Sequence, residues 1–245
     1  MSDQAQELRR MFAESGGQRY TVIASLSRPA MALPIAASAC RDLAAEGVDT
    51  LWIDDLPLAE REDWPISRTS RFSLEQVRRG FVPLNRAIAE SADGVRYIHS
   101  GATTQDTDSW LRHGVGGPLP ASLADDLGFF QRILITTTEG NLITPADHPI
   151  ETDMLVVSGA GVTESNDLIL WMVRAEANFR PKKWGLILVG DLFEGNRSWE
   201  ELSPLCKRYL SGEVDLISAV DGRLDDLVLA GSWVPDKRQL LGFLS

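Results

Sequence analysis

Short apolar runs that are rich in β-branched residues alternate along this chain with segments of helical spacing. The runs cover residues 21–24, 50–53, 95–98, 132–136, 154–158, 185–189 and 214–219. A run that is apolar along most of its length, rather than at every second position, is typical of a strand buried on both faces. Strands that alternate with helices are joined in parallel by crossover connections. The sequence therefore predicts an α/β fold whose mostly parallel sheet is covered by helices on both faces.

The helical segments are predicted from the spacing of their apolar residues. They cover residues 4–13, 33–46, 74–88, 119–127, 164–178, 199–210 and 235–243, and residues 103–112 are either a helix or a long turn. The segment 74–88 has its apolar side chains on one face at helical spacing, although Pro83 lies within it. We expect residues 1–17 to be a short helix with a tether, Ser15-Gly16-Gly17 being the break, and residues 18–245 to form one domain.

The overall charge limits the classes of partner. The chain has 245 residues and a net charge of −11, with a hydrophobic fraction of 44%. A chain of this length buries a large core without disulfides or metals. An acidic surface repels phosphate backbones, so we expect no nucleic-acid partner.

Cysteines, histidines and apolar windows carry no further chemical motif. Cys40 and Cys206 lack metal-ligand spacing and indicate buried thiols in a reducing compartment, while His99, His113 and His148 indicate loop positions. The first charged helix is not followed by a long apolar stretch, and no window reaches the roughly 18 apolar residues that a membrane span needs. We therefore expect a cytoplasmic protein that is not inserted in the membrane.

The connection between the first strand and its helix is the most informative segment. Residues 25–33 read Ser-Leu-Ser-Arg-Pro-Ala-Met-Ala-Leu and contain neither glycine nor lysine. A phosphate-binding loop needs glycines, so that successive backbone N–H groups turn towards the anion. It also needs a lysine and a hydroxyl for the terminal phosphates and Mg²⁺. This connection therefore occupies the place of a phosphate loop without its chemistry.

This segment resembles the deviant P-loop of the MinD/ParA ATPases, in which the strand leads into G-K-G-G-x-G-K-T. Aligned without a gap, Ser27 takes the place of the signature lysine, Ala32 that of the P-loop lysine and Leu33 that of the threonine. Residues 38–40 take the place of N-L-A in the family's helix, and residues 43–44 and 47 match its L-A and its final glycine. The resemblance implies a P-loop NTPase-like fold whose nucleotide site is degenerate.

The other nucleotide-site positions of the family differ as well. Where the family writes I-I-I-D-T-x-A-G, Thr136 stands in place of the aspartate, and Gly190-Asp191 stands where an adenine-reading asparagine belongs. Asp54 alone keeps a carboxylate at the end of the second strand, and its simpler role is that of a strand-end residue or helix cap. We therefore expect neither ATP binding nor hydrolysis, and no cofactor or metal.

The N-terminal segment 3–12 has a distinct amphipathic pattern. Leu8, Met11 and Phe12 share one face, which Ala5 extends by a turn. From the residues alone, this is an ordinary amphipathic helix that packs on its own domain.

The same segment resembles the D-Q-A-x-x-L-R motif of the flagellar-number branch of the MinD family, FlhG (also called FleN or YlxH). Asp3, Gln4, Ala5, Leu8 and Arg9 match every specified position. In that branch the helix docks on FlhF, a signal-recognition-particle-type GTPase, and the glutamine reaches the GTP site. The resemblance therefore implies a regulator that stimulates a partner's GTP hydrolysis, and a polar location reached through that partner.

Two alternative functions remain open at the level of sequence. The domain is also similar to MinD-like scaffolds of pilus assembly or cellulose secretion, which would not use the N-terminal glutamine. An enzyme with another ligand at the strand ends would use Asp54, Asp55, Thr136–Thr138 and Glu139, yet no nucleophile and base are evident. Residues 236–245 are too short and too weakly basic for a membrane anchor and indicate a helix that packs on the sheet. An active MinD-like paralogue is a further partner that the sequence leaves open.

Overall fold

The computed structural model describes residues 19–26, 29–57, 71–101, 126–138, 152–159, 162–179, 181–190, 192–221 and 237–244. Its centre is an eight-stranded sheet in the order β3-β4-β2-β5-β1-β6-β7-β8. The strands are β1 (Arg19–Ser25), β2 (Thr50–Asp54), β3 (Ala89–Glu90), β4 (Arg96–His99), β5 (Arg132–Thr137), β6 (Asp153–Gly159), β7 (Lys183–Gly190) and β8 (Glu213–Asp221). Every neighbouring pair is parallel except β3 and β4 at one edge.

The central strands are buried on both faces, as their apolar sequences predict. Every residue of β2 and of β5 is buried, and β1 becomes buried from Thr21 onwards. Side chains of one strand alternate between two hydrophobic clusters. Val22 and Ala24 belong to the first cluster, whereas Ile23 belongs to the second, on the opposite face. The predicted strands and the mostly parallel α/β fold are thus confirmed.

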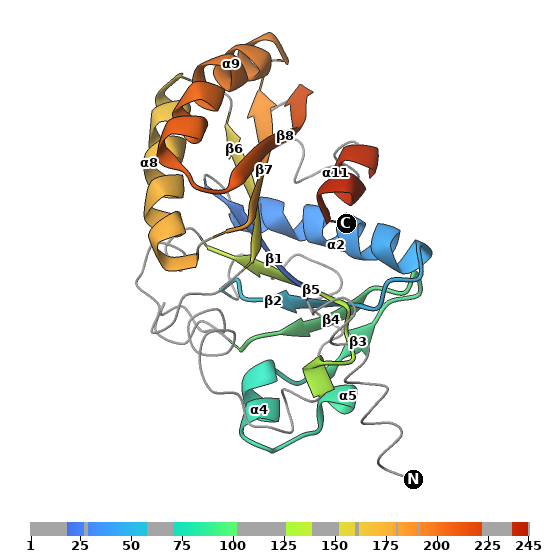
Figure 1. The fold of residues 1–245 in the computed structure, drawn as a ribbon. Coiled ribbons are helices and arrows are strands. Elements are labelled where there is room, and N and C mark those ends of the chain that lie inside the picture. Colours follow the sequence, from blue (N-terminus) through green and yellow to red (C-terminus); the bar gives the residue numbers. More distant parts are fainter. Residues whose placement is uncertain are drawn as a thin grey trace.

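Helices cover both faces of this sheet (Figure 1). They are α2 (Ala32–Ala45), α4 (Leu74–Arg78), α5 (Leu84–Ala87), α8 (Val162–Phe179), α9 (Leu192–Tyr209) and α11 (Lys237–Leu244), and a 3-10 turn, η1 (Pro29–Met31), precedes α2. Buried side chains of α2 and α11 belong to one cluster, and those of α4, α5, α8 and α9 belong to the other. The sheet is therefore the middle of three layers.

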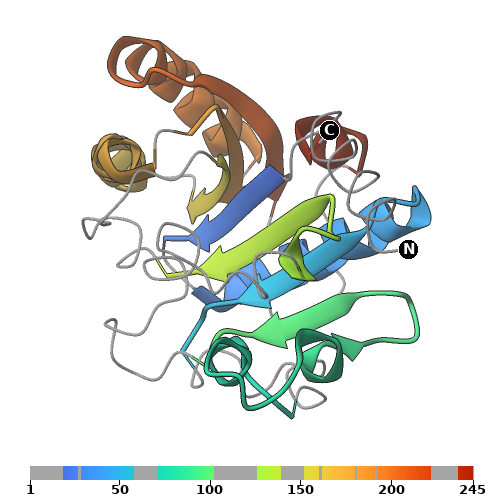
Figure 2. The ribbon, with the colours of Figure 1, turned by 60° about the horizontal axis from the view of Figure 1, so that its bottom comes forward.

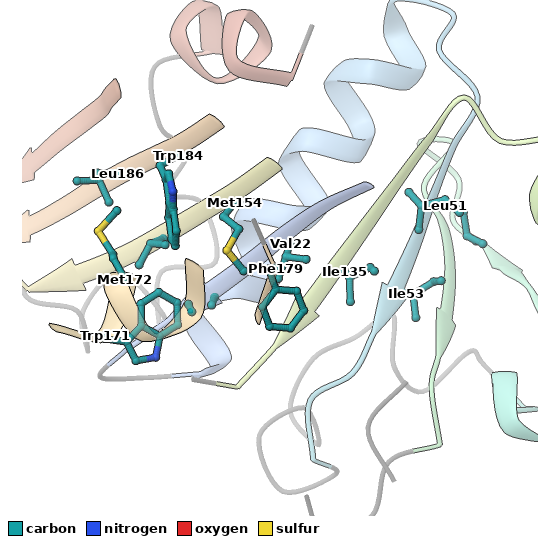
Figure 3. Close-up of a cluster of buried hydrophobic side chains, with 14 of the residues drawn as sticks. Val22, Leu51, Ile53, Ile135, Met154, Trp171, Met172, Phe179, Trp184 and Leu186 are labelled. Carbon is teal, nitrogen blue, oxygen red and sulfur yellow. The ribbon is translucent and has the colours of Figure 1, made fainter. Parts of the chain in front are cut away.

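The cluster beneath α8 and α9 contains two buried tryptophans, Trp171 and Trp184. Figure 3 shows Trp171 and Phe179 of α8 facing strand residues that include Met154, Trp184 and Val22. The rings of Trp171 and Trp184 meet edge to face, with centroids 6.4 Å apart. Trp184 of β7 and Phe179 of α8 are also fully buried. These aromatic contacts hold α8 against the sheet.

The predicted helix 74–88 is wrong as a single element. It is two short helices, α4 and α5, because Gly80 takes a φ of +75° and Pro83 provides no backbone N–H within the following turn. Ser73 caps α4 in a capping box with Gln76, as a helix start requires. The predicted inward face also fails at Phe81, whose side chain is 75% exposed.

Other boundaries were predicted less well than the strands. The helix predicted at 199–210 begins seven residues earlier, at Leu192. Its first turns were not predicted, because Gly195 and Ser198 have low helix propensities. Residues 103–112 lie outside the described ranges, and of 119–127 only Asp126 and Leu127 are described, as helix.

The two cysteines and one histidine can be placed. Cys40 and Cys206 are free and buried as predicted, on opposite faces of the sheet. Burial raises the pKa of both thiols, that of Cys206 to about 11, so neither is a thiolate at neutral pH. His99 was predicted to lie in a loop, but it is the last residue of β4. His113 and His148 lie outside the described residues.

Candidate functional site at the carboxyl ends of the strands

The carboxyl ends of β2, β5, β1 and β6 meet at one edge of the sheet. In a doubly wound sheet this edge holds the ligand crevice, where the strand order reverses. Here β2 lies on one side of β1 and β6 lies on the other. The connections that follow β1 and β5 therefore run to opposite sides of β1. The register places Ile23 of β1 beside Thr136 of β5, so the first strand-to-helix connection starts next to Thr136.

That connection brings apolar side chains to the start of α2. Ser25 is fully buried, and Leu26 donates its backbone N–H to the carbonyl of Val157 over 3.0 Å. Ala32 and Leu33, which take the positions of a lysine and a threonine, are buried in the core between α2 and the sheet. Ser27 lies outside the described residues. The buried start of α2 therefore presents methyl and isobutyl groups at the two positions where the family has an ammonium and a hydroxyl.

The helix start itself carries no capping group. The residue before α2 is Met31, which is fully buried and forms no side-chain cap, and the first turn has no acidic residue. Residues 19–46 include no glycine, so no backbone N–H in the described part of this connection is turned by a left-handed residue. The described residues of this connection thus provide neither a glycine nor a capping side chain at the start of α2.

Asp54 lies at the centre of a buried hydrogen-bond network. Its Oδ1 accepts from the Thr136 hydroxyl at 2.8 Å and from the backbone N–H of Leu56 at 3.1 Å. Its Oδ2 accepts from the Tyr97 hydroxyl at 3.0 Å. Asp54 and Thr136 are both fully buried and are register partners on neighbouring strands. The carboxylate therefore has three donors, from β5, from β4 and from the residues that follow β2.

The network extends through an aromatic pair. Trp52 donates its indole N–H to Thr136 Oγ1 at 3.0 Å, so the hydroxyl accepts from the indole and donates to Asp54. The rings of Trp52 and Tyr97 meet edge to face with centroids 5.0 Å apart. A chain of donors that ends on a carboxylate is stronger than its separate bonds. The group that holds β2, β4 and β5 together is thus Trp52, Asp54, Tyr97 and Thr136.

Backbone bonds reinforce the same strand ends. The backbone N–H of Asp55 donates to the Thr136 carbonyl, and that of Ser100 donates to the Asp54 carbonyl, both at 2.8 Å. The sequence singled out Asp54 and Thr136 but missed Trp52 and Tyr97. For Trp52 a signal was available, because Trp52 and Asp54 are two residues apart in one strand and so point to the same face.

The polar residues proposed for another ligand are brought together only in part. Asp54, Asp55 and Thr136 are fully buried, as is Thr137, while Thr138 is half-buried. Glu139 and Asp191 lie outside the described residues. Within the described ranges, no group of three or more histidine, cysteine, aspartate or glutamate side chains is placed to hold a metal ion.

The two chain ends differ in what can be described. Asp3, Gln4, Ala5, Leu8 and Arg9, and the proposed boundary at residue 17, lie outside the described residues. At the other end α11 packs on the sheet as predicted, with Leu240, Phe243 and Leu244 buried. Lys237 adds an ion pair with Asp42 of α2 at 2.8 Å, which raises the lysine's pKa. No helix in the described part of the chain has the length and apolar character to cross a bilayer.

Comparisons with known proteins find similarity in structure only. No protein-family model matches the chain, and no curated protein matches it in sequence. The cell-division protein MinD of Aquifex aeolicus superposes with a TM-score of 0.56 at 17% identity, covering 87% of each chain.

Two further solved structures agree. The cell-division ATPase MinD of Pyrococcus furiosus gives a TM-score of 0.55 at 16% identity, covering 92% of this chain and 98% of that one. A plasmid partition protein of Borrelia burgdorferi, bound to AMPPNP, gives 0.53 at 16% identity, covering 93% and 98%. Identities this low establish the architecture alone. The chain has the P-loop NTPase-like α/β fold of the MinD and ParA-type ATPases.

Proposed function

We propose that this protein is a non-hydrolysing MinD-like regulator of flagellar biosynthesis or number, which acts through protein contacts. The observation that carries the first half of the proposal is the start of α2. Ala32 and Leu33 are buried apolar residues there, in a connection without glycine or lysine. Each lost donor of a phosphoryl-transfer site typically costs about 10² to 10³ in rate, and several are absent here.

The Asp54 network supports the same conclusion. In an ATPase of this fold, a carboxylate at the position of Thr136 orients water on Mg²⁺. Here Thr136 uses its hydroxyl to bridge Trp52 and Asp54. Asp54 is buried and already accepts three hydrogen bonds, so it is engaged in joining strands. A carboxylate held in this way is a poor candidate for orienting a catalytic water.

The second half of the proposal rests on the N-terminal motif. Asp3, Gln4, Ala5, Leu8 and Arg9 match the D-Q-A-x-x-L-R helix of the FlhG branch. In the proposed mechanism this helix docks on an FlhF-type GTPase, and the side-chain amide of Gln4 positions the water that attacks GTP. In this mechanism the predicted break at Gly16 and Gly17 would serve as the tether. Nothing in this mechanism requires a nucleotide on the regulator itself.

GTP hydrolysis by the FlhF-type partner tests the mechanism directly. The intact protein should accelerate hydrolysis, and Gln4→Ala should abolish most of that acceleration. Gln6→Ala is the matched control, since Gln6 lies in the same segment at an unspecified position of the motif. If the intact protein leaves the rate unchanged, the flagellar mechanism fails and the scaffold alternative of pilus assembly or cellulose secretion gains support. Equal effects of the two substitutions would rule out the assigned role of Gln4.

Calorimetry with Mg-ATP tests the nucleotide site separately. We expect no heat of binding in the micromolar range, because the buried start of α2 offers no cradle for a triphosphate. An active MinD-family ATPase serves as the positive control under the same conditions. Micromolar affinity for this chain would contradict the proposed loss of the site, whatever the outcome of the GTPase assay.

A further inference from the structure

The segment 71–86 has the opposite charge to the rest of the molecule. It carries four arginines, Arg71, Arg78, Arg79 and Arg86, against one carboxylate, Glu75, so its net charge is +3. Since the whole chain carries −11, the remaining residues carry −14. All four arginines are exposed. We call these four arginines together with Phe81 the basic patch.

The basic patch lies on the outward side of α4 and α5. Leu74, Val77, Leu84 and Ala87 are buried and turn inward to the core. The exposed positions of the same two helices therefore face away from the sheet. Both views of the ribbon place α4 and α5 side by side at the end of the sheet that contains β4 (Figures 1 and 2). Arg78 and Arg79 are joined through Glu75, and Phe81 follows them in the turn between the two helices.

Phe81 projects from the turn that ends α4. The N–H of Gly80 donates to Val77 O at 2.8 Å and that of Phe81 donates to Gln76 O at 2.9 Å, which is a Schellman motif with Gly80 in its left-handed position. In this motif the residue after the glycine usually packs back on the helix. Phe81 instead leaves 75% of its surface exposed, more than any other large apolar side chain described. The turn therefore presents a phenyl ring to a partner.

Glu75 holds the two neighbouring guanidinium groups in place. Its carboxylate accepts from Arg78 Nε at 2.6 Å, from a second nitrogen of Arg78 at 2.7 Å and from Arg79 Nε at 2.7 Å. These hydrogen bonds hold the pKa of Glu75 at about 2, against the smaller opposing effect of burial. Each guanidinium has five N–H donors, so most remain for a ligand. Arg71 and Arg86 form no ion pair with any residue in the described ranges.

We propose that the basic patch is a docking surface for an acidic segment of a partner protein, in which carboxylates flank an apolar side chain. Carboxylates bind the fork-shaped donors of Arg78 and Arg79 in a bidentate manner, and the apolar side chain packs on Phe81. An arginine held in advance loses little entropy on binding. The surface is separate from the N-terminal motif, so it adds a second contact to the proposed regulator.

Charge decides between this partner and larger anions. The net charge of −11 on the whole chain opposes its approach to an extended polyanion such as a membrane or a nucleic acid. Basic residues attract an anionic membrane by only about 1 kcal/mol each, so the patch alone is a weak anchor. A short acidic segment carries little charge beyond the contacts that it makes with the arginines. The acidic segment is therefore the favoured occupant.

Peptide binding to the full-length protein tests this proposal. The probe is a fluorescent helix-forming peptide of glutamate and leucine, about twelve residues or three helical turns long, with a lysine and leucine peptide and an all-glutamate peptide as comparisons. We expect saturable anisotropy changes with the first peptide only. Phe81→Ser and Arg79→Gln should each weaken binding about tenfold, which corresponds to the loss of one contact of about 1.4 kcal/mol. Both side chains are exposed, so the fold should be unaffected.

Matched variants test whether peptide binding depends on this surface. Arg197→Gln removes an exposed arginine that also pairs with a glutamate, Glu201 at 3.2 Å, and should leave peptide binding unchanged. Gln4→Ala should leave it unchanged too, although it abolishes the proposed GTPase stimulation. Absence of binding by the glutamate and leucine peptide, or equal affinity in all variants, would overturn the proposal. So would Phe81-dependent binding to phosphatidylglycerol vesicles or Phe81-dependent self-association without peptide binding, which would assign the patch to a membrane or a second copy.

Discussion

At the scale of single residues, two buried threonines on the same face of the sheet have opposite roles. The Thr136 hydroxyl accepts from Trp52 and donates to Asp54. The hydroxyl of Thr21 is equally buried in β1 but has no hydrogen-bond partner in the described part of the chain. A buried polar group stabilises only when it is bonded. Replacement of each threonine by the isosteric valine therefore separates the hydrogen-bond contribution from packing.

We predict that Thr136→Val lowers the free energy of unfolding by about 1–3 kcal/mol, because it leaves the indole N–H of Trp52 and one oxygen of Asp54 short of a partner. Thr21→Val should be neutral or stabilising, since it removes an unbonded hydroxyl. Urea unfolding followed by tryptophan fluorescence measures both. Equal losses in the two variants would mean that the Asp54 network contributes nothing beyond packing.

A second residue-scale prediction concerns the pH dependence of Glu75. Hydrogen bonds from Arg78 and Arg79 lower its pKa to about 2 in the folded protein. A lowered pKa in the folded state means that the contribution to stability is complete above the ordinary glutamate value and declines as the pH falls towards 2. In NMR titrations the Glu75 carboxyl should remain ionised at a pH of about 3.5, where free glutamate is largely protonated. The double variant Arg78→Gln/Arg79→Gln should return the titration midpoint of Glu75 to the ordinary range. An unchanged midpoint would show that these two arginines do not lower its pKa.

At the scale of elements, two glycines that are each followed by phenylalanine, Gly80 and Gly242, have different roles in their helices. Gly80 ends α4 with a φ of +75°, and Gly242 lies inside α11 without a left-handed φ. An added Cβ would meet nothing within 4 Å at either position. The two glycines therefore differ in backbone conformation and not in available space.

We predict opposite effects of alanine at these two glycines. Gly80→Ala should destabilise the protein by about 1–2 kcal/mol, because a left-handed conformation is strained for a residue with a Cβ. Gly242→Ala should stabilise it by about 0.5–1 kcal/mol, because alanine costs less entropy in a helix. Thermal unfolding of both variants beside the parent compares them. A gain in stability for Gly80→Ala would show that the turn does not require its glycine.

The same elements explain how much of the fold and site is visible in the sequence. The strands were predicted because burial on both faces demands continuous apolar runs, as in Thr50–Asp54. The helix over 74–88 was misjudged, since apolar spacing continues across the turn at Gly80 while the helix does not. The partners of Asp54 come from neighbouring strands whose adjacency depends on topology, so Tyr97 was not foreseen.

At the scale of the whole molecule, the last helix is part of the core. Gly185 of β7 has no side chain, and a Cβ there would lie 2.8 Å from Leu155 Cδ1, 2.9 Å from Ile217 Cγ1 and 3.2 Å from Phe243 Cδ2. The phenyl ring of Phe243 therefore occupies space on the sheet that this glycine leaves free. Such a close fit indicates that α11 stabilises the domain and is not held in reserve for another surface.

A structural role for α11 predicts a loss of stability that a detachable anchor would not show. Phe243→Ala should cost about 3–5 kcal/mol, because Phe243 is only 4% exposed and its truncation leaves a cavity between α11 and the sheet. The matched control is Leu170→Ala on α8, whose side chain is 58% exposed and should matter by no more than about 0.5 kcal/mol. Urea midpoints measure both, and similar small losses would mean that α11 leaves the sheet at little cost. A large loss at Phe243 alone would instead tie α11 to folding, as its close fit against Gly185 of β7 requires.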